Sequence, residues 1–213
     1  MKTENKFFIG IGLVTLVAII AAVFLLGREK PKEVASSAKQ VDLISGAKHF
    51  EGSPEAKVKI VEFGDYQCPA CGQAHPILKE VLAKNQGKIY FVFRNFPLSN
   101  IHANAKDSAR AAEASGEQGK YFEMHDLLYE NQKDWSELSN PKQKFLEYAK
   151  NLGLDISKFE NDYNQAIGVI NADYALGQKA GVESTPTFFI NQQKYPGVIP
   201  ADKLQRIIDE LSK

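Results

Sequence analysis

Runs of β-branched and aromatic residues mark the places where the chain is expected to form strands. VKIVEFG, residues 58–64, is the first such run, and residues 88–98 form a second one that is nearly continuous in apolar side chains. Continuous apolar runs are typical of strands that are buried on both faces of a sheet. Two more runs, residues 185–191 and 194–200, follow near the end of the sequence. The pattern predicts strands on both sides of a long central region.

That central region, residues 102–181, shows apolar residues at helical spacing and no strand pattern. Within it, Asn140 is a candidate N-cap and Pro141 a candidate first helical residue. Strands and helices together predict an α/β domain over residues 46–213, in which the central region is an inserted helical subdomain.

Two further helices are predicted outside the insertion. Residues 74–85 carry apolar side chains at helical offsets, and Pro76 is expected to kink that helix. Residues 201–213 place four aliphatic side chains on one helical face. Residues 49–58, HFEGSPEAKV, contain Gly, Ser and Pro in succession, which is typical of a turn before the first strand.

The N-terminal region contains a long apolar segment. Residues 7–26 are twenty positions without a charge, with Thr15 as the one polar residue, and as a helix they would be about 30 Å long, the thickness of a bilayer core. A cleaved signal peptide is the alternative, but its apolar region usually spans only about 7–15 residues. The segment also ends in bulky residues rather than a small-x-small cleavage site. We therefore predict an uncleaved signal-anchor over residues 1–26, which forms one transmembrane helix.

Residues 27–45 are rich in Lys, Ser, Ala and Gln and contain no aromatic residue, which is typical of a linker. Basic residues lie on both sides of the apolar segment, so the positive-inside rule does not favour an inside N-terminus. Over the whole chain, 26 basic residues balance 26 acidic ones. A nucleic-acid-binding domain usually carries a basic patch or stripe, so no nucleic-acid partner is predicted.

Cys68 and Cys71 are the two cysteines of the chain, and they follow the first predicted strand directly. A thiolate at the start of a helix is stabilised by unpaired N–H groups and by the helix dipole, so its pKa falls. Cys68 is expected to be the exposed nucleophile, and Cys71, one turn further on, to be buried and to resolve the mixed disulfide. Pro69 suits the first helical position, where its missing N–H costs nothing.

Other roles for the two cysteines are less consistent with the sequence. Zinc would bind Cys68, Cys71 and His75, but a structural site usually needs a fourth Cys or His ligand. The remaining histidines, His49, His102 and His125, show no metal spacing, and no metal site is predicted. A purely structural bridge across so short a loop would add little stability. Thiol–disulfide exchange is the chemistry that this arrangement favours.

EFGDYQCPACG (residues 62–72), followed by STPTFFIN (residues 184–191), resembles the DsbA-like branch of the thioredoxin-fold oxidoreductases. The resemblance covers roughly residues 45–213 and implies a thioredoxin-like fold with a helical insertion. It implies that the Cys68–Cys71 disulfide is the redox centre and that no further cofactor is needed.

The resemblance also assigns roles to the residues around the cysteines. It implies a cis peptide bond before Pro186, which leaves the backbone of Thr185 free to pair with a substrate as an added strand. Pro69 and Ala70 would face the same substrate. Ala70 departs from the strongly oxidising enzymes, which have His at this position, and this leaves the direction of electron flow open.

Glu62 lies six residues before Cys68, where the family carries a buried acid beneath the pair. There it would transfer the proton of Cys71 by general acid–base catalysis. The alternative is a surface glutamate on the strand, and the neighbours Val61 and Phe63 do not decide which face is buried.

The resemblance implies a membrane-anchored enzyme whose catalytic domain lies outside the cytoplasmic membrane, at the cell surface or in the periplasm. It would introduce disulfides into exported cysteine-containing proteins and be reoxidised by a membrane redox partner, which the resemblance implies to be quinone-linked. A disulfide reductase or isomerase is one alternative. A thioredoxin-fold module that binds peptides without redox turnover is another.

Overall fold

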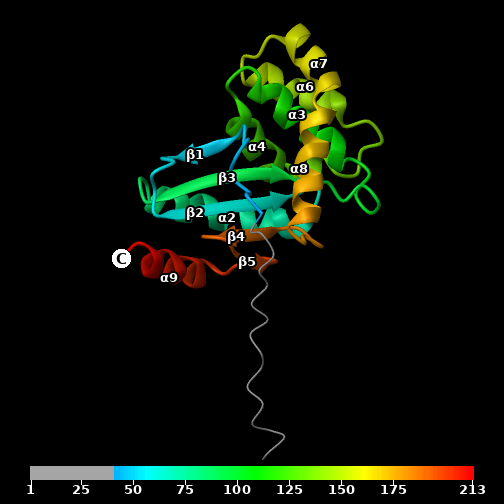
Figure 1. Ribbon diagram of the computed structural model, residues 1–213. Coiled ribbons are helices and arrows are strands. Elements are labelled where there is room, and N and C mark those ends of the chain that lie inside the picture. The colour runs from blue at the N-terminus through cyan, green and yellow to red at the C-terminus, as the bar shows by residue number, and fades with distance from the viewer. Residues whose placement is uncertain (1–40) are drawn as a thin grey trace, which may run out of the picture. The chain divides into compact units, whose positions relative to one another are not determined.

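The computed structural model describes residues 41–213, which are built around a five-stranded mixed sheet (Figure 1). The strand order is β1-β3-β2-β4-β5. Strands β2 and β3 are parallel, and the other three neighbouring pairs are antiparallel. The strands are β1 (Phe50–Gly52), β2 (Val58–Gly64), β3 (Ile89–Asn95), β4 (Thr187–Ile190) and β5 (Gln193–Pro196).

The helices occupy the positions that the sequence pattern predicts. Helix α2 links the parallel strands β2 and β3, α9 closes the chain, and the other helices form the insertion between β3 and β4. The helices are α2 (Pro69–Lys84), α3 (Ala105–Gly116), α4 (Tyr121–Glu130), α5 (Gln132–Trp135), α6 (Lys142–Asn151), α7 (Ile156–Gln165), α8 (Ile167–Lys179) and α9 (Ala201–Leu211). The predicted α/β fold with a helical insertion is confirmed.

Side chains alternate between the two faces of the sheet, and each face is covered. Val58 and Ile60 of β2 join a core with α2, α3, α4 and α9, whereas Val61 and Phe63 join a second core on the side of α8. Both faces of β2 are therefore buried. The same is true of β3, as its nearly continuous apolar run predicts. Glu62 lies two residues after Ile60, and every second side chain of a strand points to the same face of the sheet. The Glu62 side chain therefore belongs to the face that carries α2.

Two local predictions need correction. Strand β1 lies within the segment that was expected to be a turn, because three exposed residues at a sheet edge are too few to show an alternating pattern. Gly52 permits this pairing: it has φ of 84°, and a Cβ there would lie 2.1 Å from the carbonyl oxygen of Ile89. Helix α6 begins at Lys142, with Pro141 rather than Asn140 at its N-cap.

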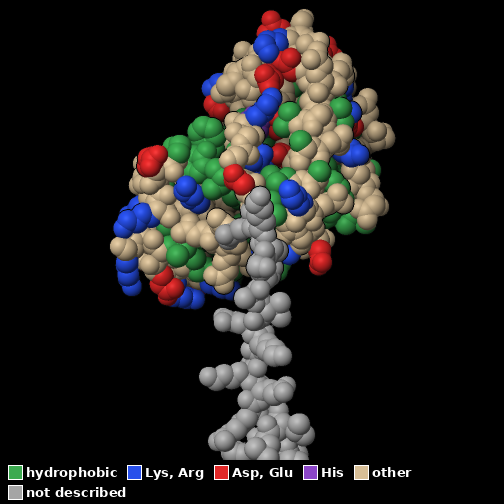
Figure 2. All heavy atoms as spheres, in the orientation of Figure 1, with side chains coloured by type: hydrophobic (Ala, Val, Ile, Leu, Met, Phe, Trp, Pro, Cys, Tyr) green, Lys and Arg blue, Asp and Glu red, His purple; other side chains and the backbone are tan. Residues whose placement is uncertain are grey.

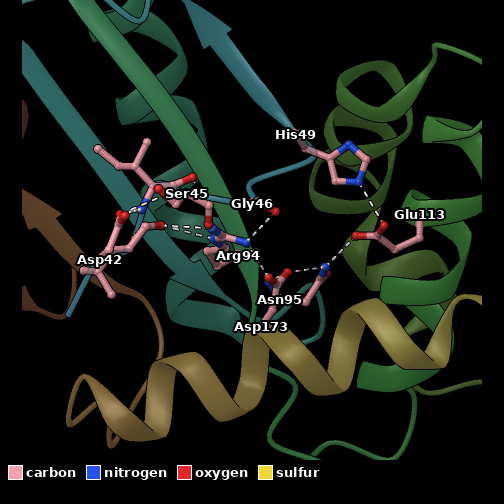
Figure 3. Close-up of polar contacts among 10 residues, drawn as sticks. Asp42, Ser45, Gly46, His49, Arg94, Asn95, Glu113 and Asp173 are labelled. Atoms are coloured by element: carbon pink, nitrogen blue, oxygen red, sulfur yellow. Dashed lines mark hydrogen bonds and ion pairs between the residues drawn. The ribbon is translucent and has the colours of Figure 1, made fainter.

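The last part of the predicted linker packs on the domain (Figure 3). Arg94 of β3, which is 5% exposed, donates hydrogen bonds from its guanidinium to the main-chain carbonyl oxygens of residues 43–46. Its Nη1 also lies 2.9 Å from Oδ1 of Asp173 in α8. Leu43 is buried in the same region. The folded part therefore begins before residue 46, and composition missed it because main-chain carbonyls carry no sequence signal.

The network around Arg94 continues toward the helical insertion (Figure 3). Asn95 donates from Nδ2 to Asp173 at 3.2 Å and to Glu113 of α3 at 2.8 Å. Glu113 in turn lies 2.9 Å from Nε2 of His49. Residues 43–49 are thereby joined to β3, α3 and α8 through polar side chains. Buried polar groups need such partners to offset the cost of losing their contacts with water.

The face in Figure 2 carries basic and acidic side chains intermingled over its surface, in keeping with the equal counts of the two signs. The predicted transmembrane segment, residues 7–26, lies outside the described residues. Within residues 41–213, none of the helices has the length and apolar character that a bilayer crossing requires.

Candidate active site

The two cysteines lie where β2 ends and α2 begins. Cys68 is the N-cap of α2, with φ of −68° and ψ of 121°, and Pro69 occupies the first helical position as predicted. The main-chain N–H of Cys68 donates to the carbonyl oxygen of Asp65, while its own carbonyl accepts from Gly72. Cys68 therefore lies immediately before the first residue of α2.

The register of the sheet brings the second motif to the same end. Phe63 in β2 pairs with Thr187 in β4, so the residues just before Thr187 lie beside the loop that follows β2. The peptide bond between Thr185 and Pro186 is cis, as the family resemblance implied. The structure therefore brings Cys68 and Thr185 together although they are 117 positions apart in the sequence.

Cys68 is less exposed than expected. Both cysteines are free thiols, with Cys68 7% exposed and Cys71 fully buried. The Cys68 thiol donates to the carbonyl oxygen of Thr185 at 3.3 Å, so the loop before Pro186 covers part of the sulfur. The predicted order of exposure is correct, but the nucleophile is shielded rather than open.

The environment separates the acidities of the two thiols. A hydrogen bond from the Cys71 side chain, followed by one from Thr185 and by the main-chain N–H groups of Cys71 and Ala70, lowers the pKa of Cys68 from 9.0 to about 5. Burial raises the pKa of Cys71 well above its usual range, and the hydrogen bond to Cys68 adds to this. At neutral pH, Cys68 is a thiolate and Cys71 a thiol, which matches their expected roles as nucleophile and resolving residue.

Thr185 contributes two different groups to the Cys68 sulfur. Its carbonyl accepts a hydrogen bond from the protonated thiol. Its buried hydroxyl forms no hydrogen bond within the described residues, so it is available to donate to the sulfur once the thiolate forms, and this interaction lowers the Cys68 pKa. A thiolate accepts hydrogen bonds but cannot donate one, so the two forms of Cys68 use different atoms of Thr185.

Thr185→Val keeps the size of the side chain but removes the hydroxyl, so we expect it to raise the Cys68 pKa by about one unit, the equivalent of one hydrogen bond to a charged group. The pH dependence of iodoacetamide alkylation of the reduced protein measures this. The midpoint for the native protein should lie near 5. An unchanged midpoint in the variant would show that the hydroxyl does not stabilise the thiolate.

Glu62 is 2% exposed and belongs to the sheet face that carries α2, so it is not a surface glutamate. Burial, with a smaller contribution from the negative charge of Cys68, raises its pKa from 4.5 to about 8. Its charge in turn raises the pKa of Cys71. Glu62 is therefore protonated at neutral pH and lies close enough to influence both thiols.

Pro69 and Ala70 separate the cysteines at the molecular surface. Pro69 is exposed and Ala70 is half-buried, so both are accessible next to the sulfur of Cys68. The Ala70 side chain has no polar atom, and its contribution to the thiolate is made by its main-chain N–H.

Several residues that sequence reasoning missed hold the active-site loop. Asp65 accepts hydrogen bonds from the main chain of Gln67 and Leu98, and its Oδ2 lies 2.7 Å from Nδ1 of His102. Gln132 in α5 donates to the carbonyl oxygens of Tyr66 and Cys68, at 2.7 and 2.9 Å. Most of these hydrogen bonds join residues that are 33 to 66 positions apart in the sequence, so no local sequence pattern indicates them.

Comparison with known proteins places the chain in a family. The thioredoxin family model matches residues 45–210, which is most of the chain. A solved thiol–disulfide exchange protein, α-DsbA2 from Wolbachia pipientis, is 26% identical with a TM-score of 0.66 and aligns over 76% of this chain and 86% of its own. This chain is a DsbA-like member of the thioredoxin family.

Two other solved structures are similar as well. A thioredoxin-like oxidoreductase from Silicibacter pomeroyi is 29% identical with a TM-score of 0.64, over 76% of this chain and 90% of that one. BdbD from Bacillus subtilis shares the fold, with 22% identity and a TM-score of 0.68 over 76% of this chain and 91% of that one.

The curated relatives are longer proteins. Na⁺/H⁺ antiporter NhaA 1 from a Mycobacterium strain is 35% identical over 167 residues, and NhaA 3 from Salinispora tropica is 37% identical over 151 residues. The matched segments cover 76% and 70% of this chain but only 26% and 22% of the relatives. The chain thus spans about a quarter of their length, and the similarity concerns its thioredoxin-like part.

Proposed function

We propose that this DsbA-like chain is a membrane-anchored, extracytoplasmic oxidase that introduces disulfides into exported proteins. The observation that carries the proposal is the low pKa of Cys68, about 5. A stabilised thiolate favours the reduced form of the pair, so the Cys68–Cys71 disulfide readily accepts electrons. The signal-anchor over residues 1–26 would hold the domain at the membrane.

The reaction transfers two electrons from the substrate to the cysteine pair. A substrate thiolate attacks the Cys68 sulfur of the disulfide, a mixed disulfide forms, and Cys71 leaves as a thiolate. Glu62, protonated at neutral pH, gives its proton to Cys71, whose thiol form is strongly favoured. A second substrate thiolate then attacks its own half of the mixed disulfide and releases Cys68 as a thiolate. The substrate leaves oxidised and the pair reduced.

The substrate is proposed to pair with the backbone at Thr185, beside the exposed Pro69 and Ala70. Main-chain pairing accepts many sequences, which suits an enzyme for a range of unfolded exported chains. After each cycle, a membrane redox partner, proposed to be quinone-linked, removes the two electrons and restores the disulfide. No other cofactor is required in this scheme.

A disulfide reductase or isomerase is the second candidate, favoured by the apolar Ala70 between the cysteines. Without a side-chain donor at this position, Cys68 depends on main-chain N–H groups, Cys71 and Thr185. The two candidates differ in the reduction potential of the pair.

The deciding experiment is equilibration of the detergent-solubilised full chain with glutathione redox buffers. We expect a potential near the value of about −120 mV that is found for DsbA. A potential near about −270 mV, as in thioredoxin, would instead assign the chain to the reductases.

A further inference from the structure

A cluster of three metal-binding side chains lies outside the cysteine pair. His75 comes from α2, four residues after Cys71, and His125 and Asp126 come from α4 of the helical insertion. Each offers one ligand atom, and these atoms all lie within 4.8 Å of one another. No sequence pattern indicates the cluster, because about fifty positions separate its two halves.

The contact between His75 and Asp126 has the spacing of two metal ligands. Nε2 of His75 lies 3.3 Å from Oδ1 of Asp126, yet this nitrogen is buried and forms no hydrogen bond with any described residue. Two atoms bound to one tetrahedral zinc at about 2.0–2.1 Å are separated by roughly 3.3 Å, because the tetrahedral angle fixes that edge. The nitrogen and oxygen are therefore close without satisfying each other as donor and acceptor.

His125 is held in an orientation that suits a ligand. Its Nδ1 lies 3.0 Å from the hydroxyl of Tyr66. A metal-binding histidine almost always uses its second nitrogen in such a contact, which fixes the ring and its tautomer.

Lys79 is a cation that contacts the cluster, and it bonds only one of the two carboxylate oxygens of Asp126. Its Nζ bonds the other carboxylate oxygen of Asp126, Oδ2, at 2.7 Å, and also Oε1 of Glu130 at 2.8 Å. The side chain of Lys79 is 51% exposed and that of Asp126 is 32% exposed. Solvent therefore reaches the carboxylate, and a water molecule can supply a fourth ligand.

We propose that His75, His125 and Asp126 form a Zn²⁺ site that links α2 of the thioredoxin domain to α4 of the insertion. Two imidazoles and one carboxylate are ligands of zinc and related transition metals, whereas Mg²⁺ and Ca²⁺ prefer oxygen alone. The site does not use the cysteines, so it differs from the zinc site of Cys68, Cys71 and His75 that the sequence analysis considered and set aside.

The test requires a protein whose thiols cannot bind the metal. In the full-length chain with Cys68→Ser and Cys71→Ser, we expect one Zn²⁺ per chain by calorimetry and tetrahedral d–d absorption with Co²⁺. His75→Gln and Asp126→Asn should each weaken Zn²⁺ binding by at least about tenfold, since changes even in outer-shell partners cost 10–100-fold. Glu130→Gln is the matched control, because Glu130 contacts the same lysine but is not one of the three ligands.

Three outcomes would overturn the proposal: no zinc binding, binding that both ligand variants retain in full, or an equal loss in Glu130→Gln. If His75→Gln does not fold, Asp126→Asn at the more exposed ligand decides alone. A zinc-dependent rise in the thermal midpoint should accompany binding in the parent chain and be absent from the ligand variants, because a ligand that binds the folded state stabilises it. None of these readouts depends on redox activity.

Discussion

Cys68→Ser is expected to reduce catalysed thiol–disulfide exchange to the uncatalysed rate. Serine keeps the fold of the site but cannot form a disulfide, and its hydroxyl does not ionise near neutral pH. The measurement is oxidation of a reduced substrate protein by catalytic amounts of the chain in the presence of oxidised glutathione. A variant that oxidises the substrate as fast as the native chain would show that Cys68 is not the nucleophile. If neither the native chain nor the variant exceeds the uncatalysed rate, the chain is a peptide-binding module without redox turnover.

Cys71→Ser is the matched variant, and it should behave differently. The Cys68 thiolate attacks the disulfide of an oxidised substrate, so that one substrate sulfur leaves as a thiolate and the other is joined to Cys68 in a mixed disulfide. Without the Cys71 thiol, the enzyme cannot release this substrate by attacking the Cys68 sulfur. We therefore expect a trapped mixed disulfide that non-reducing gel electrophoresis detects and a reductant dissolves. Trapping through Cys71 in the Cys68→Ser variant would reverse the assignment of nucleophile and resolving residue.

Glu62→Gln is expected to change how the stability of the reduced protein depends on pH. Below pH 4.5, Glu62 is protonated in both the folded and the unfolded chain and contributes no difference. As the pH rises from 4.5 to about 8, the unfolded chain releases a proton that the folded chain retains. The free energy of unfolding therefore falls over this interval, by about 5 kcal/mol at about 1.36 kcal/mol per unit, and levels off above it.

Glutamine stays neutral, so this fall is absent from the variant. Urea unfolding of both reduced proteins at pH 5 and pH 8.5 tests the prediction, and the variant should gain several kcal/mol relative to the native protein between these values. A constant difference would show that Glu62 is ionised at both pH values. In the oxidised protein the effect should be smaller but present, because burial contributes more to the raised pKa of Glu62 than the Cys68 charge does.

The sequence predicted the cysteine motif and its setting because the relevant information is local. One strand, two cysteines and the start of one helix lie within residues 58–84. Pro186 was reached through the resemblance, and the sheet register explains why it lies at the site. The order of thiol exposure also followed from position on the helix, since Cys71 lies one turn further in than Cys68.

The buried orientation of Glu62 could not be predicted, because both faces of β2 are apolar and the alternation that marks a buried face is lost. The support of the loop by His102 and Gln132 was missed for another reason. These contacts depend on how the insertion packs on the sheet, and pairs so far apart leave no periodic signal. The cluster of His75 with His125 was missed for the same reason.

The bonds between Arg94 and residues 43–46 also have a mechanical consequence. A force applied to the chain at residue 41 first loads several hydrogen bonds to one buried guanidinium, which is itself fixed by Asp173. These bonds share the load before it reaches β1, which leads through β2 to Cys68. A pull at residue 41 is therefore resisted at Arg94 before it is transmitted through β1 and β2 toward Cys68.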